Sequence, residues 1–331
     1  MKFGLVPLDD AQGAILAHSE RLGDGRLRKG QVLEADDLLR LRAVGVHQVT
    51  VARLEQGDVH EDAAALALAQ AVQSEAPGIS LTNAFTGRVN LVADAPGVVQ
   101  IDAAKVTAVN LVDPMITLAT VAPLHQVQTG AMIATIKIIS YGVRDEALQA
   151  AQKAARGALT LAQPQYETAS LIVSDTAEGL GHSGVDAIRA RLTGLGIRLR
   201  QTLSCPHEEP ALAEAIAAST GDLVLVLTSS ATSDAQDTAP QALLRIGGRV
   251  ERFGIPVDPG NLLFLGWLRD KPVIGLPNSA RSPVLHGADW VLARVVCGLP
   301  PSATEFAAMG VGGLLKEIPT RPQPRQVRSK T

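Results

Sequence analysis

Aromatic residues are scarce in this chain, because Phe, Trp and Tyr make up only 3% of its 331 residues. Proteins that bind single-stranded nucleic acid stack bases on aromatic side chains, so this scarcity argues against such a platform. No charge of one sign dominates either, since 30 Lys and Arg stand against 33 Asp and Glu, for a formal net charge of −3. We therefore expect no attraction to nucleic acid or to an anionic membrane surface.

Cysteine and long apolar runs are also rare. Cys205 and Cys297 are the two cysteines, and neither lies in a CxxC pair. This disfavours a structural zinc site or a disulfide framework and fits a reducing compartment. No apolar run reaches the roughly 20 residues that span a bilayer. Charged residues and a proline already occur within residues 1–10, which disfavours a secretory signal. We expect a cytoplasmic protein.

Several common motifs of catalysis and nucleotide binding are missing. The sequence contains no GxxxxGK[ST], HxH, HExxH or GxSxG, and no evident Ser-His-Asp set. These absences disfavour zinc catalysis and a P-loop.

An α/β pattern is present in several segments of the chain. We expect a small amino-terminal region over residues 1–54 and a middle mixed α/β region over 55–165, the latter ending in a helix over 144–161. Residues 166–302 are expected to form a larger α/β domain, and 303–331 an extension. From residue 319 the extension is proline-rich and basic, which predicts a disordered tail.

The region 166–302 has the clearest alternation of strands and helices. We expect strands at residues 169–173, 197–203 and 223–227. A helix is expected to begin at Ser183, with Asp186 as its capping-box partner. A second helix is expected over 210–219. This order predicts a doubly wound, three-layer α/β domain with a parallel sheet.

A hydroxyl-rich loop, residues 228–237, follows the apolar strand 223–227. Open α/β sheets bind ligands at the carboxyl ends of their strands, and hydroxyls with backbone N–H groups suit a phosphate. Asp237 would then be either a helix cap or a Mg²⁺ ligand. The plainer alternative is a polar loop with a capping aspartate.

Further charged residues follow two other strands of this region. The carboxylates of Asp175 and Glu178 could lie in the same crevice as Asp237 and hold a metal that bridges phosphates, or they could simply be charges at the start of a helix. Arg281 lies in a loop of small residues and could hold a phosphate or a carboxylate. It could equally be a solvated surface side chain.

Residues 222–283 resemble the molybdopterin-binding domain of molybdopterin molybdotransferases, molybdopterin adenylyltransferases and the competence-damage family. Those proteins carry Thr-Gly-Gly-x-Ser-x-Gly-x-x-Asp after an Asp-Leu-Val strand, and Thr228 and Asp237 match its ends. Pro259-Gly260-Asn261 and residues 275–282 look like the Pro-Gly-Lys-Pro turn and the Gly-Leu-Pro-Gly-Asn-Pro-x-Ser loop of the molybdotransferases. A weaker likeness over 30–51 extends the match to about half of the chain.

The chain departs from this pattern at several glycines. Ser229 and Ser230 replace the Gly-Gly pair, Asp234 replaces the next glycine, and Asn278-Ser279 replace Gly-Asn. Side chains at these positions crowd a backbone that should approach phosphate closely. An altered form of pterin-phosphate binding is therefore expected.

The resemblance implies a protein that binds molybdopterin or the molybdenum cofactor during its assembly or handling. It implies either molybdate insertion into adenylylated molybdopterin with Mg²⁺, or a carrier without turnover. It also implies a homo-oligomer, and a molybdoenzyme or cofactor-maturation protein as partner. The alternatives are a nucleotide pyrophosphatase of the competence-damage type and a non-catalytic interaction module.

The residues that the resemblance implicates fall into two groups. Asp237, Asp175 and Glu178 are implied as catalytic, with Asp237 and Glu178 as metal ligands. The implied ligand-binding residues are Thr228, Ser229, Ser230, Thr232, Asp258, Pro259, Gly260, Pro277, Asn278, Ser279, Arg281 and Ser282.

Overall fold

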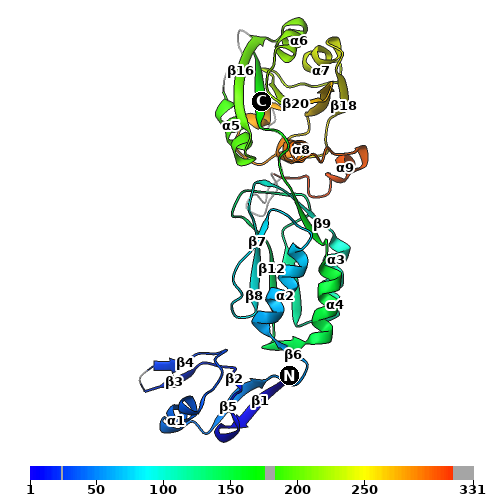
Figure 1. Ribbon diagram of the computed structural model, residues 1–331. Helices are drawn as coiled ribbons and strands as arrows, with labels where there is room; N and C mark the ends of the chain where they lie inside the picture. Colours follow the sequence, from blue (N-terminus) through cyan, green and yellow to red (C-terminus); the bar gives the residue numbers. More distant parts are fainter. Residues whose placement is uncertain (24, 176–182, 316–331) are drawn as a thin grey trace, which may run out of the picture. The chain divides into compact units, whose positions relative to one another are not determined.

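The chain forms two compact units, and a computed structural model describes it over residues 1–23, 25–175 and 183–315. The first unit contains residues 1–95 and 99–161, and the second contains Pro96–Val98 and the chain from Ala162 onward. Both units mix helices and strands (Figure 1). The chain is therefore an α/β protein, as its sequence predicts.

The amino-terminal part of the first unit is built on a three-stranded sheet in the order β1-β5-β2. Its strands pair antiparallel, and Leu16, Leu41 and Val51 are among the buried residues of its core. Its elements are β1 (Lys2–Pro7), η1 (Leu8–Asp10), β2 (Ile15–Leu16), β3 (Glu20–Leu22), β4 (Gly25–Leu27), α1 (Ala35–Ala43) and β5 (Gln48–Arg53).

The rest of the first unit packs helices against an antiparallel sheet in the order β10-β12-β8-β7. Its core includes Leu68, Leu91 and Ile136, each fully buried. Its elements are β6 (Asp58–His60), α2 (Glu61–Gln73), β7 (Ile79–Leu81), β8 (Arg88–Ala93), β9 (Gly97–Ile101), α3 (Ala103–Val112), β10 (Ile116–Thr120), β11 (His125–Val127), β12 (Met132–Ile138), β13 (Gly142–Arg144), α4 (Asp145–Ala155) and β14 (Leu159–Ala162).

The helix expected over 144–161 is shorter than the sequence suggests. Helix α4 ends at Ala155, and Gly157 adopts a positive φ of 64°. This left-handed conformation interrupts the helix at a residue that tolerates it. The chain then continues as strand β14, so the last part of that prediction is wrong.

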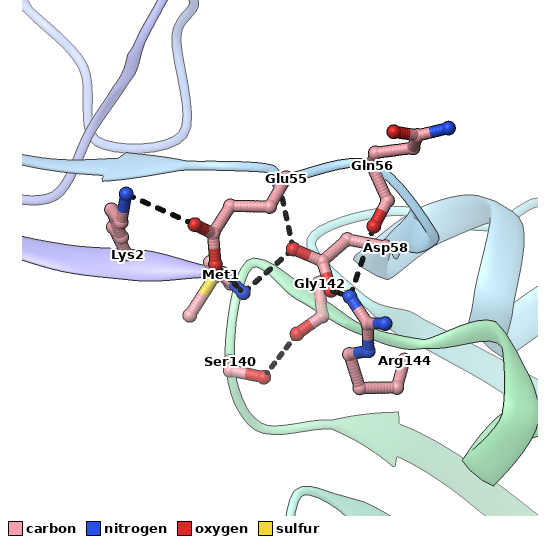
Figure 2. A network of polar contacts seen from close by, with 8 residues as sticks. All are labelled: Met1, Lys2, Glu55, Gln56, Asp58, Ser140, Gly142 and Arg144. Atoms are coloured by element: carbon pink, nitrogen blue, oxygen red, sulfur yellow. Dashed lines mark hydrogen bonds and ion pairs between the residues drawn. The ribbon is translucent and has the colours of Figure 1, made fainter.

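A polar network around Asp58 ties Met1, just before β1, to Arg144 of β13 within the first unit (Figure 2). The Asp58 side chain is 1% exposed and lies 2.6 Å from the amino nitrogen of Met1. Its carboxylate also accepts a hydrogen bond of 2.8 Å from the Glu55 N–H, and Arg144 lies 3.4 Å away. A buried carboxylate held in this way is stabilised in its charged form.

We expect the first unit to lose stability at low pH through Asp58. The hydrogen bond from the Met1 amino group, followed by that from the Glu55 N–H, holds the pKa of Asp58 below its ordinary value. Because the pKa is depressed in the folded state, the stabilisation is present above about pH 4, the unfolded pKa of aspartate, and is lost as the pH falls.

Thermal melts of wild type and Asp58→Asn between pH 3 and 7 test this expectation. The variant should be less stable at pH 7, and the difference should shrink toward pH 3. Asp9→Asn is the matched control, since the Asp9 side chain is 80% exposed. A constant difference across the pH range would contradict the assignment.

The second unit is organised around a six-stranded sheet in the order β16-β15-β17-β20-β19-β18. Strands β16, β15, β17 and β20 are parallel, and β19 runs antiparallel to both of its neighbours. Its elements are β15 (Thr168–Asp175), α5 (Val185–Gly194), β16 (Arg198–Pro206), α6 (Glu209–Ala217), β17 (Leu223–Leu227), α7 (Thr238–Arg245), β18 (Arg249–Phe253), β19 (Phe264–Leu268), β20 (Lys271–Leu276), η2 (Asn278–Arg281), α8 (Gly287–Val296) and α9 (Ala303–Ala308).

Helices cover both faces of this sheet, which gives the predicted three layers (Figure 1). Every residue of β17 is buried, because alternate side chains enter cores on opposite faces. Leu225 packs with residues of α5 and α8, whereas Val226 packs with residues of α6 and α7. The continuous apolar run at 223–227 therefore correctly predicts a central strand of a parallel sheet.

The start of α5 differs from the expected capping box. The helix has Gly184 as its N-cap, with φ of 87° and no side-chain cap. Asp186 instead forms an ion pair with Arg189 on the helix surface. The predicted pairing of Ser183 with Asp186 is therefore wrong. Over the described ranges, no helix combines the length and apolar character that crossing a bilayer requires.

Candidate functional site

The carboxyl edge of the second unit's sheet lies at a switch point of its topology. From β15 the chain passes to β16 on one side and then returns to β17 on the other. Connections that diverge from neighbouring strands in this way leave a crevice, where open α/β sheets bind their ligands. Loop 228–237 and residues 277–282, called loop 277–282 below, follow β17 and β20 at this edge.

The two loops are joined at the backbone carbonyl of Thr228. A guanidinium nitrogen of Arg281 donates to this oxygen over 3.0 Å, and the side-chain NH₂ of Asn278 donates to it over 2.8 Å. The Asn278 side-chain oxygen accepts from the Ala231 N–H over 3.2 Å. The structure thus brings together three of the residues that the sequence singled out: Thr228, Asn278 and Arg281.

Arg281 also fixes the start of α5. Its other guanidinium NH₂ donates to the carbonyl of Ser183. A Cβ on Gly184 would lie only 2.6 Å from the Arg281 Cα, so a glycine is required at this close approach. Burial lowers the pKa of Arg281, and Asp175 acts in the opposite direction. The side chain is therefore held between loops rather than solvated.

Within loop 228–237 the hydroxyls have different environments. Thr228 and Thr232 are buried, and the Thr228 hydroxyl donates to the carbonyl of Ser230 over 2.6 Å. The Ser229 Oγ is shielded from solvent and has no hydrogen-bond partner among the described residues. Ser230 is exposed. The hydroxyls of Ser229 and Ser230, the two serines at the expected glycine positions, therefore take no part in the described hydrogen bonds within the loop.

Asp237 is the N-cap of α7. One carboxylate oxygen accepts from the Thr238 N–H over 2.7 Å, and the other accepts from the Ser233 N–H over 2.9 Å. This is the capping alternative that the sequence left open. Across the described ranges, no three His, Cys, Asp or Glu side chains gather closely enough to hold a metal.

The two other acidic candidates are placed differently. Asp175 is the last residue of β15 and lies at the carboxyl edge. Glu178 lies outside the described residues.

Replacing Asp237 with alanine is expected to destabilise the second unit by about 1 kcal/mol, because the helix loses its cap. Asparagine keeps one acceptor oxygen and should cost less. Denaturant unfolding of both variants measures the difference. Equal stability of wild type and Asp237→Ala would contradict the capping role.

The turn 258–260 lies at the same edge of the sheet. It connects β18 to β19, and Phe253 at the end of β18 pairs with Phe264 at the start of β19. Phe264 in turn pairs with Gly275 near the end of β20. The turn is therefore displaced from loop 228–237 by two strands along one edge.

Backbone contacts hold this turn. The carbonyl of Pro259 accepts from the Gly287 N–H over 2.8 Å, and the Asp258 N–H donates to the Gly313 carbonyl over 2.8 Å. A Cβ on Gly260 would lie 2.5 Å from the Gly287 nitrogen. A cavity of about 320 Å³ opens beside Asp258. Its lining includes Val257, Asn261 and Leu314.

Loop 277–282 is positioned by an arginine that sequence reasoning missed. Arg191 of α5 donates to the carbonyls of Ala280 over 2.9 Å and Ser282 over 2.7 Å, and it lies 2.5 Å from Asp289 of α8. The Arg191 side chain is 10% exposed. Within the loop, the carbonyl of Pro277 accepts from Ala280, and that of Ser279 accepts from Ser282.

His207 is a second residue that the sequence did not single out as a site residue. It follows β16, and its ring nitrogens contact Ser174 at the end of β15 and Ser230 in loop 228–237. The three residues are 33 and 23 positions apart in the chain. They meet only because β16, β15 and β17 are neighbours in the sheet, and no local motif carries that information.

A family model described as a domain of unknown function (DUF8806) matches residues 5–53. No curated protein is significantly similar in sequence to the chain.

Three solved structures are similar to parts of the chain. A molybdopterin biosynthesis MoeA protein from Pyrococcus horikosii is 13% identical, with 90% of this chain and 75% of that chain covered and a TM-score of 0.32. A molybdopterin biosynthesis protein from Mycobacterium abscessus is 14% identical, covering 41% and 94%, with a TM-score of 0.30. A molybdenum cofactor biosynthesis protein B is 13% identical, covering 40% and 88%, with a TM-score of 0.28.

Proposed function

We propose that the second unit binds a phosphorylated pterin of the molybdopterin type and acts in the assembly or handling of the molybdenum cofactor. The ligand lies at the carboxyl edge of the sheet, between loop 228–237 and loop 277–282. The proposal is supported by the motif positions of Thr228 and Asp237 in the sequence and by the geometry of the two loops.

The observation that carries the proposal is the double hydrogen bond to the Thr228 carbonyl. Arg281 and Asn278 reach one oxygen from the neighbouring loop, at 3.0 and 2.8 Å. This junction lies beside the switch point, where an anionic ligand meets both loops at once. Arg281 adds a positive charge there, and the exposed Ser230 adds a hydroxyl that can reach a phosphate.

The other ligand-binding candidates have secondary places in this proposal. Thr232, Pro277, Ser279 and Ser282 shape the two loops. The turn 258–260 lies farther along the edge, where it would meet the part of the ligand that is distant from the phosphate.

Two forms of the function differ in chemistry. In the carrier form, the loops hold the pterin and release it unchanged. In the transferase form, an adenylylated pterin is cleaved and molybdate is inserted, with Asp237, Asp175 and Glu178 as the proposed catalytic residues. The cap contacts of Asp237 favour the carrier form, because both of its oxygens already accept backbone hydrogen bonds.

Adenylylated molybdopterin distinguishes these forms. We expect it to raise the melting temperature of the protein, since a ligand at 100 times its Kd adds about 2.7 kcal/mol of stability. With Mg²⁺ and molybdate present, recovery of intact ligand supports the carrier form, and steady release of AMP supports the transferase. AMP release from ADP-ribose, without any response to the pterin, would replace the proposal with a nucleotide pyrophosphatase. No response to either compound would reject binding at this edge.

A further inference from the structure

Ser174, His207 and Ser230 form a continuous chain of hydrogen bonds at the carboxyl edge. The Ser174 Oγ lies 2.8 Å from Nδ1 of His207, and the Ser230 Oγ lies 3.1 Å from Nε2 of the same ring. Both distances are within the range of a nucleophile and its general base. Ser174 is fully buried, His207 is half-buried and Ser230 is exposed.

The three side chains differ in burial, and this difference gives each a distinct role in the series of hydrogen bonds. A neutral imidazole donates from one nitrogen and accepts at the other. When Nδ1–H donates to the buried Ser174, Nε2 accepts the hydroxyl proton of Ser230. The exposed serine is then the group that can meet a substrate, and the buried serine orients the ring.

We propose that Ser230 is a nucleophile activated by His207, that Ser174 positions the imidazole, and that the substrate is a small carboxylic ester. This activity does not depend on pterin binding. It adds a catalytic site that the sequence does not reveal, because the orienting residue is a serine in place of the usual carboxylate.

The reaction balances with water as the second substrate. The Ser230 oxygen bonds to the ester carbonyl carbon while its proton passes to Nε2 of His207. The bond from that carbon to the alcohol oxygen breaks, and the alcohol leaves with the proton from His207. Water then gives a proton to His207 while its oxygen bonds to the acyl carbon. The bond from that carbon to the Ser230 oxygen breaks, the acid leaves, and the proton passes from His207 to Ser230, which restores its hydroxyl.

A fluorophosphonate reagent tests the proposal on the intact chain. We expect it to label Ser230, as located by peptide mass spectrometry, and p-nitrophenyl acetate to be hydrolysed. Ser230→Ala should abolish both signals, and His207→Gln should lower the labelling rate at least about 100-fold. Ser233, an exposed serine in the same loop whose hydroxyl donates to the Ala231 carbonyl, is the internal control and should stay unlabelled.

Ser174→Ala tests the positioning role. It should lower the maximal labelling rate about tenfold and leave unchanged the reagent concentration that gives half of that rate, whereas a general loss of structure would change both. Thr220→Ala, at the opposite end of the sheet, should label like wild type. Melting curves confirm that each variant is folded. Wild-type labelling no faster than that of Ser230→Ala, or unaffected by His207→Gln, would overturn the proposal.

Discussion

Replacing Gly275 with alanine is expected to destabilise the second unit by about 3 kcal/mol. Gly275 lies in the buried strand β20 and pairs with Phe264 across the sheet. A Cβ at this position would lie 1.9 Å from Cε1 and 2.1 Å from Cδ1 of the Phe264 ring. The ring is fully buried, so it has no free space into which it can move.

Gly310→Ala is the matched control within the same unit. Its added Cβ would meet its nearest neighbours at 3.4 and 3.5 Å, which is ordinary van der Waals contact. Urea unfolding of both variants should show a large loss for Gly275→Ala and a change within about 0.5 kcal/mol for Gly310→Ala. Equal losses would mean that the close packing of Phe264 on Gly275 does not decide the stability of the sheet.

Arg281→Ala is expected to weaken binding of a phosphorylated pterin roughly 30-fold, or about 2 kcal/mol. The variant loses the hydrogen bonds to the carbonyls of Thr228 and Ser183 and the charge between the loops. Loop 228–237 would then be less well fixed, and ligand binding would have to order it. Titration calorimetry with molybdopterin measures the change in affinity.

Arg189→Ala controls for the loss of a positive charge on the same unit. Arg189 is 54% exposed and pairs with Asp186 on the surface of α5. Surface ion pairs contribute little, so neither affinity nor stability should change appreciably. An Arg281→Ala variant that binds the pterin as tightly as wild type would remove Arg281 from the site.

Much of the fold could be predicted from local patterns in the sequence. The sequence predicts that strand 223–227 is buried on both faces, because all five of its residues are apolar and turn residues flank it. The start of α5 could not be predicted in the same way. Ser183 and Asp186 have the spacing of a capping box, but Gly184 is the N-cap of the helix, in a left-handed conformation and close to Arg281.

The candidate site was predictable only where a motif covers contiguous residues. Loop 228–237 and loop 277–282 stand out by composition, and their position at one edge follows from a parallel sheet. His207 and Arg191 do not stand out, because their partners come from other strands and helices. Such contacts depend on the order of strands in the sheet, which periodicity does not encode.

Native mass spectrometry of the protein purified from cells that make the molybdenum cofactor tests the central claim most directly. The claim predicts a non-covalent adduct with the mass of a molybdopterin species, which is lost or reduced in Arg281→Ala and retained in Arg189→Ala. Wild-type protein that carries no pterin and takes up none when molybdopterin is added would contradict it.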